Sequence, residues 1–442
     1  MTSPTKSLFV QDERVKRRNA AEKRFHSYGL CAIGVAALAL VVLLASVLAN
    51  GASAFRQTYL MLEIPLPAET LDKGGDRDPA AMASVSTFGY APLLRDALVA
   101  SIAKLNIETT LSNKDVGDMI SKEAAASLRN QVLANPDLVG GVIALDVLAN
   151  GRIDGFFKGR VTMESAERDG NTSPEALRVA QLLADVGVLV TRFNWQFLTA
   201  PDASDQRPEA AGLGVAILGS LYMMLVVLVL ALPIGVAAAI YLEEFAPKNR
   251  VSDLIEVNIS NLAAVPSIVY GILGLAIFIN FLGLRQSSPL VGGLVLTLMT
   301  LPTIIIATRA ALKAVPPSIR DAALGLGATK MQSVFHHVLP LAAPGILTGT
   351  IIGLAQALGE TAPLLLIGMV AFVRDYPAAY SETAGLFGEA ATALPVQVFN
   401  WTQRADPGFV ERASGAIITL LVFLAVMNTV AVLLRRRFER RW

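Results

Sequence analysis

One carboxylate lies inside a long apolar run of this chain. Glu360 is preceded by IIGLAQALG and followed by TAPLLLIG. An ionised carboxylate near the middle of a bilayer costs about 3 kcal/mol on insertion scales, so such a side chain is expected to face a cavity or a partner. We therefore expect Glu360, together with the hydroxyl group of Thr361, to line a path for a solute. The alternative is a structural carboxylate that is hydrogen-bonded to a neighbouring helix.

A second charge lies near the end of another apolar run. Arg309 follows the residues TIIIAT. Its guanidinium group could line the exit path of an anion. Alternatively, the long side chain extends along the helix until its charge reaches the membrane–water interface.

Other kinds of chemistry find little support in the sequence. The three histidines and the one cysteine, Cys31, show no spacing typical of metal ligands. Asp72, Asp76 and Asp78 of the stretch LDKGGDRDP fit a solvated acidic turn better than a metal loop. The chain contains no G-x-x-x-x-G-K-[ST], H-E-x-x-H or G-x-S-x-G motif. We therefore expect no bound metal or cofactor and no catalytic activity, so that any ATP is hydrolysed by another subunit.

The composition is that of a polytopic membrane protein. Of 442 residues, 53% are hydrophobic and 17% are charged, and the formal net charge is +1. A nucleic-acid-binding protein usually has a basic surface, so the composition does not favour that class. A membrane-spanning helix needs about 20 apolar residues. Six segments have that length: 28–49, 214–242, 257–283, 287–311, 344–372 and 413–434.

Lysines and arginines at the two ends of the chain indicate its orientation. Residues 1–27 and 435–442 form basic tails, and basic residues next to spans favour the cytoplasmic side. Both termini are therefore predicted to be cytoplasmic, as an even number of spans requires, and the loop 312–343 then faces the cytoplasm too. The segment 28–49 is too long for the apolar part of a signal peptide and lacks a convincing cleavage site, so we interpret it as a retained span.

The first two spans are separated by a long segment, 50–210, which this orientation places outside the cytoplasm. It precedes the predicted membrane core, residues 211–434. Residue patterns predict these elements in the segment: strands at 59–64 and 141–148, helices at 92–105 and 116–133, and a helical stretch from Pro174 towards Trp195. We expect a small α/β domain, which we call the insert; the sequence does not indicate its role.

The loop 312–343 has the pattern of two short helices. Val315-Pro316-Pro317 ends the fourth span. Ser318 and Asp321 fit a capping box at the start of a first helix, which is predicted to run to about Leu326.

The second helix of this loop starts with a similar pattern. Thr329 and Gln332 fit another capping box, and Pro340 is predicted to end the helix. One face of this helix is apolar: Met331, Val334, Phe335, Val338 and Leu339. Between the helices, Gly325 and Gly327 predict a sharp bend. By pattern alone, this 318–340 helix pair could also be an amphipathic hairpin that rests on lipid headgroups.

Residue identities in the helix pair point to a known family. The segment resembles the EAA motif of ABC-importer permeases, with Asp in place of the usual Glu and His337 in place of the usual Ile. The matching positions are Asp321, Ala322, Ala323, Gly327, Leu339 and Pro340. The resemblance implies that this element is a coupling helix that docks on the ATP-binding subunit.

Further motifs narrow the resemblance to PstA-type permeases of phosphate ABC importers. These motifs are GETAP at 359–363, VPSIVYG at 265–271, IYLEEF at 240–245 and the lead-in from Phe197 to Pro201. The resemblance covers about 195–434. It also implies a role for position 356, four residues before Glu360, where relatives commonly have Arg. Here Gln356 can offer the substrate hydrogen bonds only.

The resemblance implies a mainly α-helical, polytopic type I importer permease in the inner membrane of a bacterium. Its partners would be a sister permease (PstC-like) in a heterodimer, a dimer of ATP-binding subunits (PstB-like) that holds ATP and Mg²⁺, and an external phosphate-binding protein (PstS-like). Two alternatives remain: a permease for sulfate or molybdate, and a membrane-anchored sensor that uses the insert. The sensor would need a transmitter domain, for which the cytoplasmic segments are too short.

Overall fold

The computed structural model describes residues 13–72, 74–370, 372, 373, 375, 376 and 385–438. Residues 1–12 and 439–442 of the predicted basic tails lie outside the described residues. The chain divides into two compact units. The first ends at Asn50 and contains the helix α1 (Glu13–Gly51) except for its last residue, and the second begins at Gly51 and contains all other elements.

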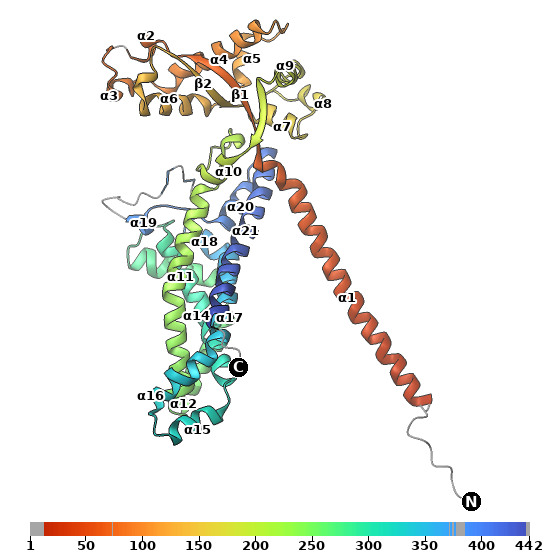
Figure 1. Ribbon diagram of the computed structural model, residues 1–442, viewed down its shortest axis with the longest axis vertical. Coiled ribbons are helices and arrows are strands. Elements are labelled where there is room, and N and C mark those ends of the chain that lie inside the picture. The colour runs from red at the N-terminus through yellow and green to blue at the C-terminus, as the bar shows by residue number, and fades with distance from the viewer. Residues whose placement is uncertain (1–12, 73, 371, 374, 377–384, 439–442) are drawn as a thin grey trace, which may run out of the picture. The chain divides into compact units, whose positions relative to one another are not determined.

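The membrane part of the second unit is a bundle of helices (Figure 1). Three of them continue as π-helical turns. The elements are α11 (Gly214–Ile240, with a π-helical end Tyr241–Phe245), α12 (Arg250–Ala263), α13 (Ser267–Gly274, continued by π-helical Leu275–Phe281), α14 (Pro289–Lys313), α15 (Pro317–Gly325), α16 (Lys330–Ser333, continued by π-helical Val334–Val338), α17 (Leu339–Gly359), α18 (Ala362–Leu366), α19 (Gly385–Gly388), α20 (Leu394–Thr402) and α21 (Pro407–Phe438).

The number of candidate spans agrees with the sequence prediction. Five described helices are long and apolar enough to cross a membrane: Glu13–Phe55, Gly214–Phe245, Pro289–Lys313, Lys330–Gly359 and Pro407–Arg437. The sixth is a pair, Arg250–Ala263 and Ser267–Phe281, bent by 101°. The predicted span 257–283 is therefore not one straight helix. Pro266 lies at the bend, and a proline disfavours helical backbone at the residue before it.

The insert is an α/β domain, as predicted, with an antiparallel sheet in the order β2-β1-β3. Its elements and the adjoining short helices are η1 (Ala52–Phe55), β1 (Arg56–Pro65), α2 (Ala68–Leu71), α3 (Pro79–Met82), α4 (Thr87–Lys104), α5 (Asn113–Asp118), α6 (Ala124–Ala134), η2 (Pro136–Leu138), β2 (Val142–Leu148), α7 (Gly151–Phe157), α8 (Met163–Ala166), α9 (Pro174–Asp185), β3 (Leu189–Phe193), α10 (Trp195–Thr199) and η3 (Pro208–Ala210). The two predicted strands are present as parts of β1 and β2.

Two helix predictions in the insert are wrong in extent. The predicted helix 116–133 is two helices, α5 and α6, separated by residues 119–123. The helical stretch predicted from Pro174 ends at Asp185, because Gly187 has a φ of +78° and reverses the chain. The following residues, Leu189–Phe193, pair with β1 instead. Leu189 and Val190 suit a strand, and this pairing with a distant segment overrode the helical pattern.

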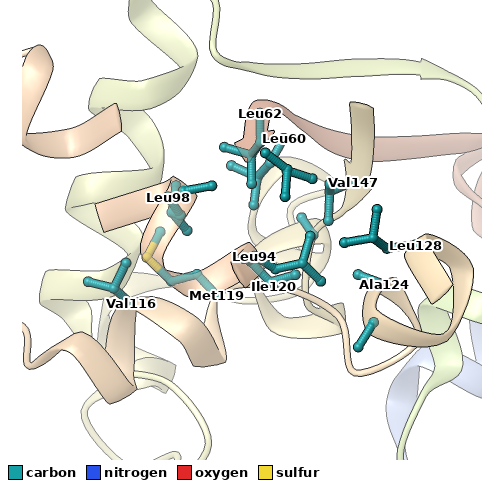
Figure 2. Close-up of a cluster of buried hydrophobic side chains, with 14 of the residues drawn as sticks. Leu60, Leu62, Leu94, Leu98, Val116, Met119, Ile120, Ala124, Leu128 and Val147 are labelled. Carbon is teal, nitrogen blue, oxygen red and sulfur yellow. The ribbon is translucent and has the colours of Figure 1, made fainter. Parts of the chain in front are cut away.

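The insert has a hydrophobic core of its own (Figure 2). Leu60, Leu62 and Ile64 alternate along β1 and are at most 2% exposed, whereas Met61 between them is 44% exposed. This period of two places one face of the sheet against the helices. Leu94 and Leu98 of α4 belong to the same buried cluster. The insert is therefore a folded domain and not an extended loop.

The spans α14 and α17 pack closely through small residues. A Cβ atom added to Gly349 would lie 2.2 Å from the Cβ of Ala307, and one added to Gly345 would lie 2.7 Å from the Cβ of Ala311. Gly353 continues the four-residue spacing and faces Ile304. In lipid there is no hydrophobic force between helices, so close backbone packing of small residues is a main source of their association.

We predict that Gly349→Ala destabilises the bundle by about 1–3 kcal/mol, because the added methyl group overpacks the contact with Ala307. The thermal midpoint of the purified protein measures the effect. The double variant Gly349→Ala/Ala307→Gly should recover most of the loss, and Gly34→Ala, whose Cβ would meet nothing within 4 Å, is the control. An unchanged midpoint for Gly349→Ala would contradict the packing argument.

Candidate functional site

The first helix of the 318–340 helix pair, α15, starts two residues earlier than a capping box at Ser318 implies. It begins at Pro317, with Pro316 as the N-cap residue. Among the described residues, no side chain caps this helix start with a hydrogen bond. The predicted capping box of Ser318 and Asp321 is therefore wrong. Proline suits the first position of a helix, because its fixed φ is helical and its missing N–H group needs no acceptor there. Asp321 is exposed and is left available on the surface.

The bend after α15 requires a glycine. Gly327 has a φ of +86°, a conformation that side chains disfavour. Its N–H group donates to the carbonyl of Leu324 at 2.9 Å, and the N–H group of Ala328 donates to the carbonyl of Ala323 at 3.1 Å. These two bonds form a Schellman motif, which satisfies the last carbonyl groups of the helix. The sharp bend expected at Gly327 is therefore present.

The second helix begins as predicted but does not end as predicted. The N–H group of Thr329 donates to Gln332 Oε1 at 2.9 Å, and the N–H group of Gln332 donates to Thr329 Oγ1 at 3.3 Å. This confirms the second capping box. Pro340, however, does not end the helix, which runs continuously from Lys330 to Gly359. A π-helical turn, Val334–Val338, ends two residues before the proline and accommodates its missing N–H group.

The helix pair is anchored to two spans by Arg320. Its Nη2 donates to Glu244 Oε1 at 2.6 Å and to the carbonyl of Leu312 at 2.9 Å, and its Nη1 donates to the carbonyl of Val315 at 2.8 Å. Glu244 comes from the end of α11 and is only 8% exposed, whereas Leu312 and Val315 lie at the end of α14. Sequence reasoning missed this pair, although Glu244 lies within the IYLEEF motif.

The tip of the helix pair exposes apolar side chains. Leu326 is 91% exposed, Met331 is 62% exposed and Leu324 is 48% exposed. Of the residues that matched the EAA spacing, Ala323 is buried and Leu339 is half-buried, while Asp321, Ala322, Gly327 and Pro340 are exposed. An exposed apolar tip on an anchored support is suited to contact with another protein.

Arg309, the basic residue predicted for the solute path, is paired within the chain. Its Nη2 lies 2.8 Å from Glu256 Oε1, and its Nε lies 3.3 Å from Glu243 Oε2. The Arg309 side chain is 13% exposed. Its charge is thus largely balanced by two carboxylates.

Glu360 lies where the fifth predicted span is broken. The helix α17 ends at Gly359, Glu360 has extended backbone angles (φ −78°, ψ 127°), and the short helix α18 starts at Ala362. The predicted span 344–372 is therefore interrupted at this residue. The side chain is half-buried, and among the described residues it has no hydrogen bond or ion pair. Broken helices at membrane depth are typical of substrate and ion sites.

The structure brings two of the sequence motifs together at this break. A Cβ atom added to Gly271, of VPSIVYG, would lie 2.7 Å from the Cα of Pro363, of GETAP. The two motifs therefore contact each other through their backbones. Tyr270 holds the preceding bend, since its hydroxyl group donates to the carbonyl of Leu262 at 2.8 Å.

Glu360 and Gln356 border one face of α17. Exposed residues recur along this helix at Ile352, Gln356 and Gly359, a spacing that places them on one side of a helix. The described chain leaves this face open. Thr361, directly after Glu360, is half-buried.

The structure does not place Arg309 near Glu360 and Gln356. Since Ala311 faces Gly345 and Ala307 faces Gly349, Arg309 is level with about residue 347 of α17. That level is about 20 Å along the helix from Glu360 at 1.5 Å per residue.

A groove of about 730 Å³ between α11 and the α16–α17 helix is lined by apolar and aromatic residues and includes neither Glu360 nor Gln356.

Comparisons with known proteins match most of the chain. Residues 231–442 match the family described as "Binding-protein-dependent transport system inner membrane component". Residues 12–167 match a domain of unknown function, DUF3333. The probable ABC transporter permease protein YqgI of Bacillus subtilis is 31% identical over 251 residues, which are 55% of this chain and 83% of the relative.

Two further similarities concern a phosphate permease and a solved transporter. The phosphate transport system permease protein PstA 1 of Mycobacterium tuberculosis is 33% identical over 234 residues, 52% of this chain and 73% of the relative. A chain of the MetNI methionine ABC transporter in an inward-facing conformation is 16% identical, with a TM-score of 0.39, over 52% of this chain and 95% of that chain.

We predict that Arg320→Met lowers the stability of the chain by about 1.5–3 kcal/mol, the usual cost of losing hydrogen bonds to a charged group. Glu244→Gln should lower it less, and the double variant should lose less than the sum of the two, because both changes remove the same contact. Thermal unfolding of the purified protein gives the comparison.

The control for this cycle is Arg168→Met, which breaks a pair with Glu164 whose side chains are each 78% exposed. Such a pair contributes about 0–1 kcal/mol. Strictly additive losses for Arg320→Met and Glu244→Gln would show that the two residues do not act together.

Proposed function

Because the chain belongs to the family of binding-protein-dependent transport system inner membrane components, and within it to the PstA-type permeases, we propose that it carries inorganic phosphate through the inner membrane as one permease subunit of an ATP-driven importer. The chain is a non-catalytic subunit. The observation that carries the proposal is the 318–340 helix pair, an exposed apolar tip that is fixed to two spans by Arg320.

In this proposal the helix pair is the contact with the ATP-binding subunits. Leu326 is the most exposed apolar residue of the tip, so it would enter a groove of the ATPase. Asp321 and Ala322 are exposed on the same helix, α15, and would form part of that contact. Coupling requires a stiff element, and the hydrogen bonds of Arg320 supply the stiffness.

A displacement of the tip of the 318–340 helix pair would be transmitted along one helix, Lys330–Gly359. The second helix of the pair is continuous with α17, which ends at Gly359, directly before Glu360. Rotation or translation of this helix would therefore act directly on the break that contains Glu360. This arrangement supports alternating access driven by the ATPase.

The phosphate path would run along the open face of α17, next to Glu360, Thr361 and Gln356. A PstC-like sister permease would cover this face and complete the path. Since Gln356 is uncharged, and Arg309 is paired with carboxylates at a distant level of the bundle, the cation that balances phosphate and Glu360 would come from the sister subunit.

The proposed orientation follows from the basic tails. Both termini and the helix pair would face the cytoplasm, and the insert would face a PstS-like phosphate-binding protein outside. PstB-like ATPases would bind from the cytoplasm. The chain then extends as basic tail 1–27, first span 28–49, insert 50–210, permease core 211–434 and basic tail 435–442.

The alternative substrates are other tetrahedral oxyanions, and a competition experiment separates them. Uptake of labelled phosphate by vesicles that contain the whole importer should be blocked by unlabelled phosphate but not by equal sulfate or molybdate. Competition by sulfate or molybdate at the same concentration would favour the rival oxyanion. ATP-independent signalling without any uptake would favour the sensor.

We predict that Leu326→Asp lowers ATP-driven phosphate uptake at least tenfold, because a charge at the tip cannot enter an apolar groove of the ATPase. Reconstituted vesicles with both permeases, the ATPase and the binding protein provide the measurement. The matched control is Val186→Asp in the insert, at a position that is 54% exposed. Normal uptake by the Leu326 variant would mean that the helix pair does not dock as proposed.

We predict that Glu360→Gln lowers phosphate uptake at least tenfold while the importer still assembles and hydrolyses ATP without substrate. The substitution keeps the shape of the side chain and removes its charge, so the break in the helix should persist. Thr361→Val, which removes a hydroxyl group only, should have a smaller effect. Full uptake by the Glu360 variant would assign that carboxylate a structural role.

A further inference from the structure

The insert and the last helix, α21, are joined by buried charges. Lys158 Nζ lies 2.7 Å from Asp154 Oδ2 and 3.0 Å from Glu411 Oε1. Arg160 forms an ion pair with Glu411 as well. The side chains of Asp154, Lys158 and Glu411 are each at most 3% exposed. Asp154, Lys158 and Arg160 belong to the insert, whereas Glu411 lies near the start of α21.

The next residue of α21 contacts another part of the insert. Arg412 Nη2 donates to Gln57 Oε1 at 2.7 Å and to the carbonyl of Glu209 at 2.9 Å. Its guanidinium group also lies 5.2 Å from the ring centroid of Phe197. Gln57 is a fully buried residue of β1, and Arg412 is 2% exposed. We call Asp154, Lys158, Arg160, Glu411 and Arg412 the junction cluster.

A separate contact reinforces the junction at α20. Trp401 Nε1 donates to Asp202 Oδ1 at 2.9 Å, and Arg404 Nη2 donates to Asp202 Oδ2 at 2.5 Å. Trp401 is fully buried, and Asp202 is 9% exposed. The chain that leaves the insert is thus fixed to the membrane bundle before α11 begins.

Burial makes this junction rigid. A desolvated charge is stable only beside its partner, so any tilt of the insert against α21 would separate Lys158 from Glu411 within a dry environment. The neighbouring Glu209 is also buried, and burial raises the pKa of its carboxyl group. Ser121 donates to Glu209 Oε1 at 2.6 Å, and a Cβ atom on Gly151 would lie 2.7 Å from Glu209 Oε2, so the packing leaves little room for movement.

We propose that the junction cluster makes the insert a rigid extension of α21, so that the two move as one body when the protein changes conformation. Arg435, near the other end of α21, donates to Thr348 Oγ1 of α17 at 3.1 Å. A protein that binds the insert would therefore act on α21 and, through it, on α17, which ends directly before Glu360. The inference concerns movement only and holds whichever solute is carried.

The test is a distance measurement between two spin labels in the assembled complex in lipid nanodiscs. Cys31→Ser removes the single cysteine, and Lys104→Cys in α4 and Val430→Cys in α21 place labels at exposed positions. We expect one narrow distance distribution that is the same without nucleotide and with trapped ATP. A distribution that shifts with nucleotide, or that is broad in the unaltered junction, would overturn the proposal.

Two substitutions test the cause of the rigidity. Lys158→Met and Glu411→Gln should each widen the distribution at least twofold, whereas the exposed-pair control Arg168→Met should leave it unchanged. A width unchanged by both junction variants would overturn the role of the cluster. Should these variants fail to fold, the measurement on the unaltered junction still decides whether the insert and α21 move together.

Discussion

The cost of an unpaired charge in a low-dielectric environment organises this structure. Arg309, Arg320 and Arg412 all lie on or next to membrane helices, and each has partners within the chain. Arg309 and Arg320 pair with residues near the 318–340 helix pair, and Arg412 pairs with residues of the insert. The helix pair (α15 and α16) and the insert lie at opposite ends of the helical bundle (Figure 1). Between these ends, Glu360 has no partner among the described residues. That contrast singles out Glu360, because an unpaired carboxylate is expensive unless another subunit or a substrate meets it.

The two charged ends are connected by helices that pack closely. α17 contacts α14 through glycines and alanines and is linked to α21 through Arg435 and Thr348. It is also continuous with the second helix of the 318–340 helix pair. Elements from both ends of the bundle therefore contact the same helix. Close packing matters here, since loosely packed helices would absorb a small displacement instead of transmitting it.

The π-helical turn at Val334–Val338 allows this continuity. Pro340 cannot donate a backbone hydrogen bond to the preceding turn, and the π-helical turn lies where that bond is missing. The glycine at 327 has the opposite role, because its positive φ ends α15 sharply. Gly327 thus bends the chain, whereas Pro340 does not. The result is a short helix, α15, followed by a long continuous helix, Lys330–Gly359.

Four features could be predicted from residues that are close along the chain: the helical membrane core, the strands β1 and β2, the capping box at Thr329 and the bend at Gly327. Each depends on residues that are close along the chain, where periodicity, capping and glycine geometry act. The unusual carboxylate at Glu360 was also apparent, because the cost of its charge depends only on the apolar run around it.

Tertiary structure decided the features that join distant segments. β3 replaced a predicted helix because its residues pair with β1, and the helix continues through Pro340 with a π-helical turn just before it. The pairing of Arg320 with Glu244, and of Lys158 with Glu411, joins residues that are 76 and more than 200 positions apart. Sequence patterns describe which side chains need a partner, but the partner is chosen by the packing of the whole chain, in which long-range contacts outweigh local preference.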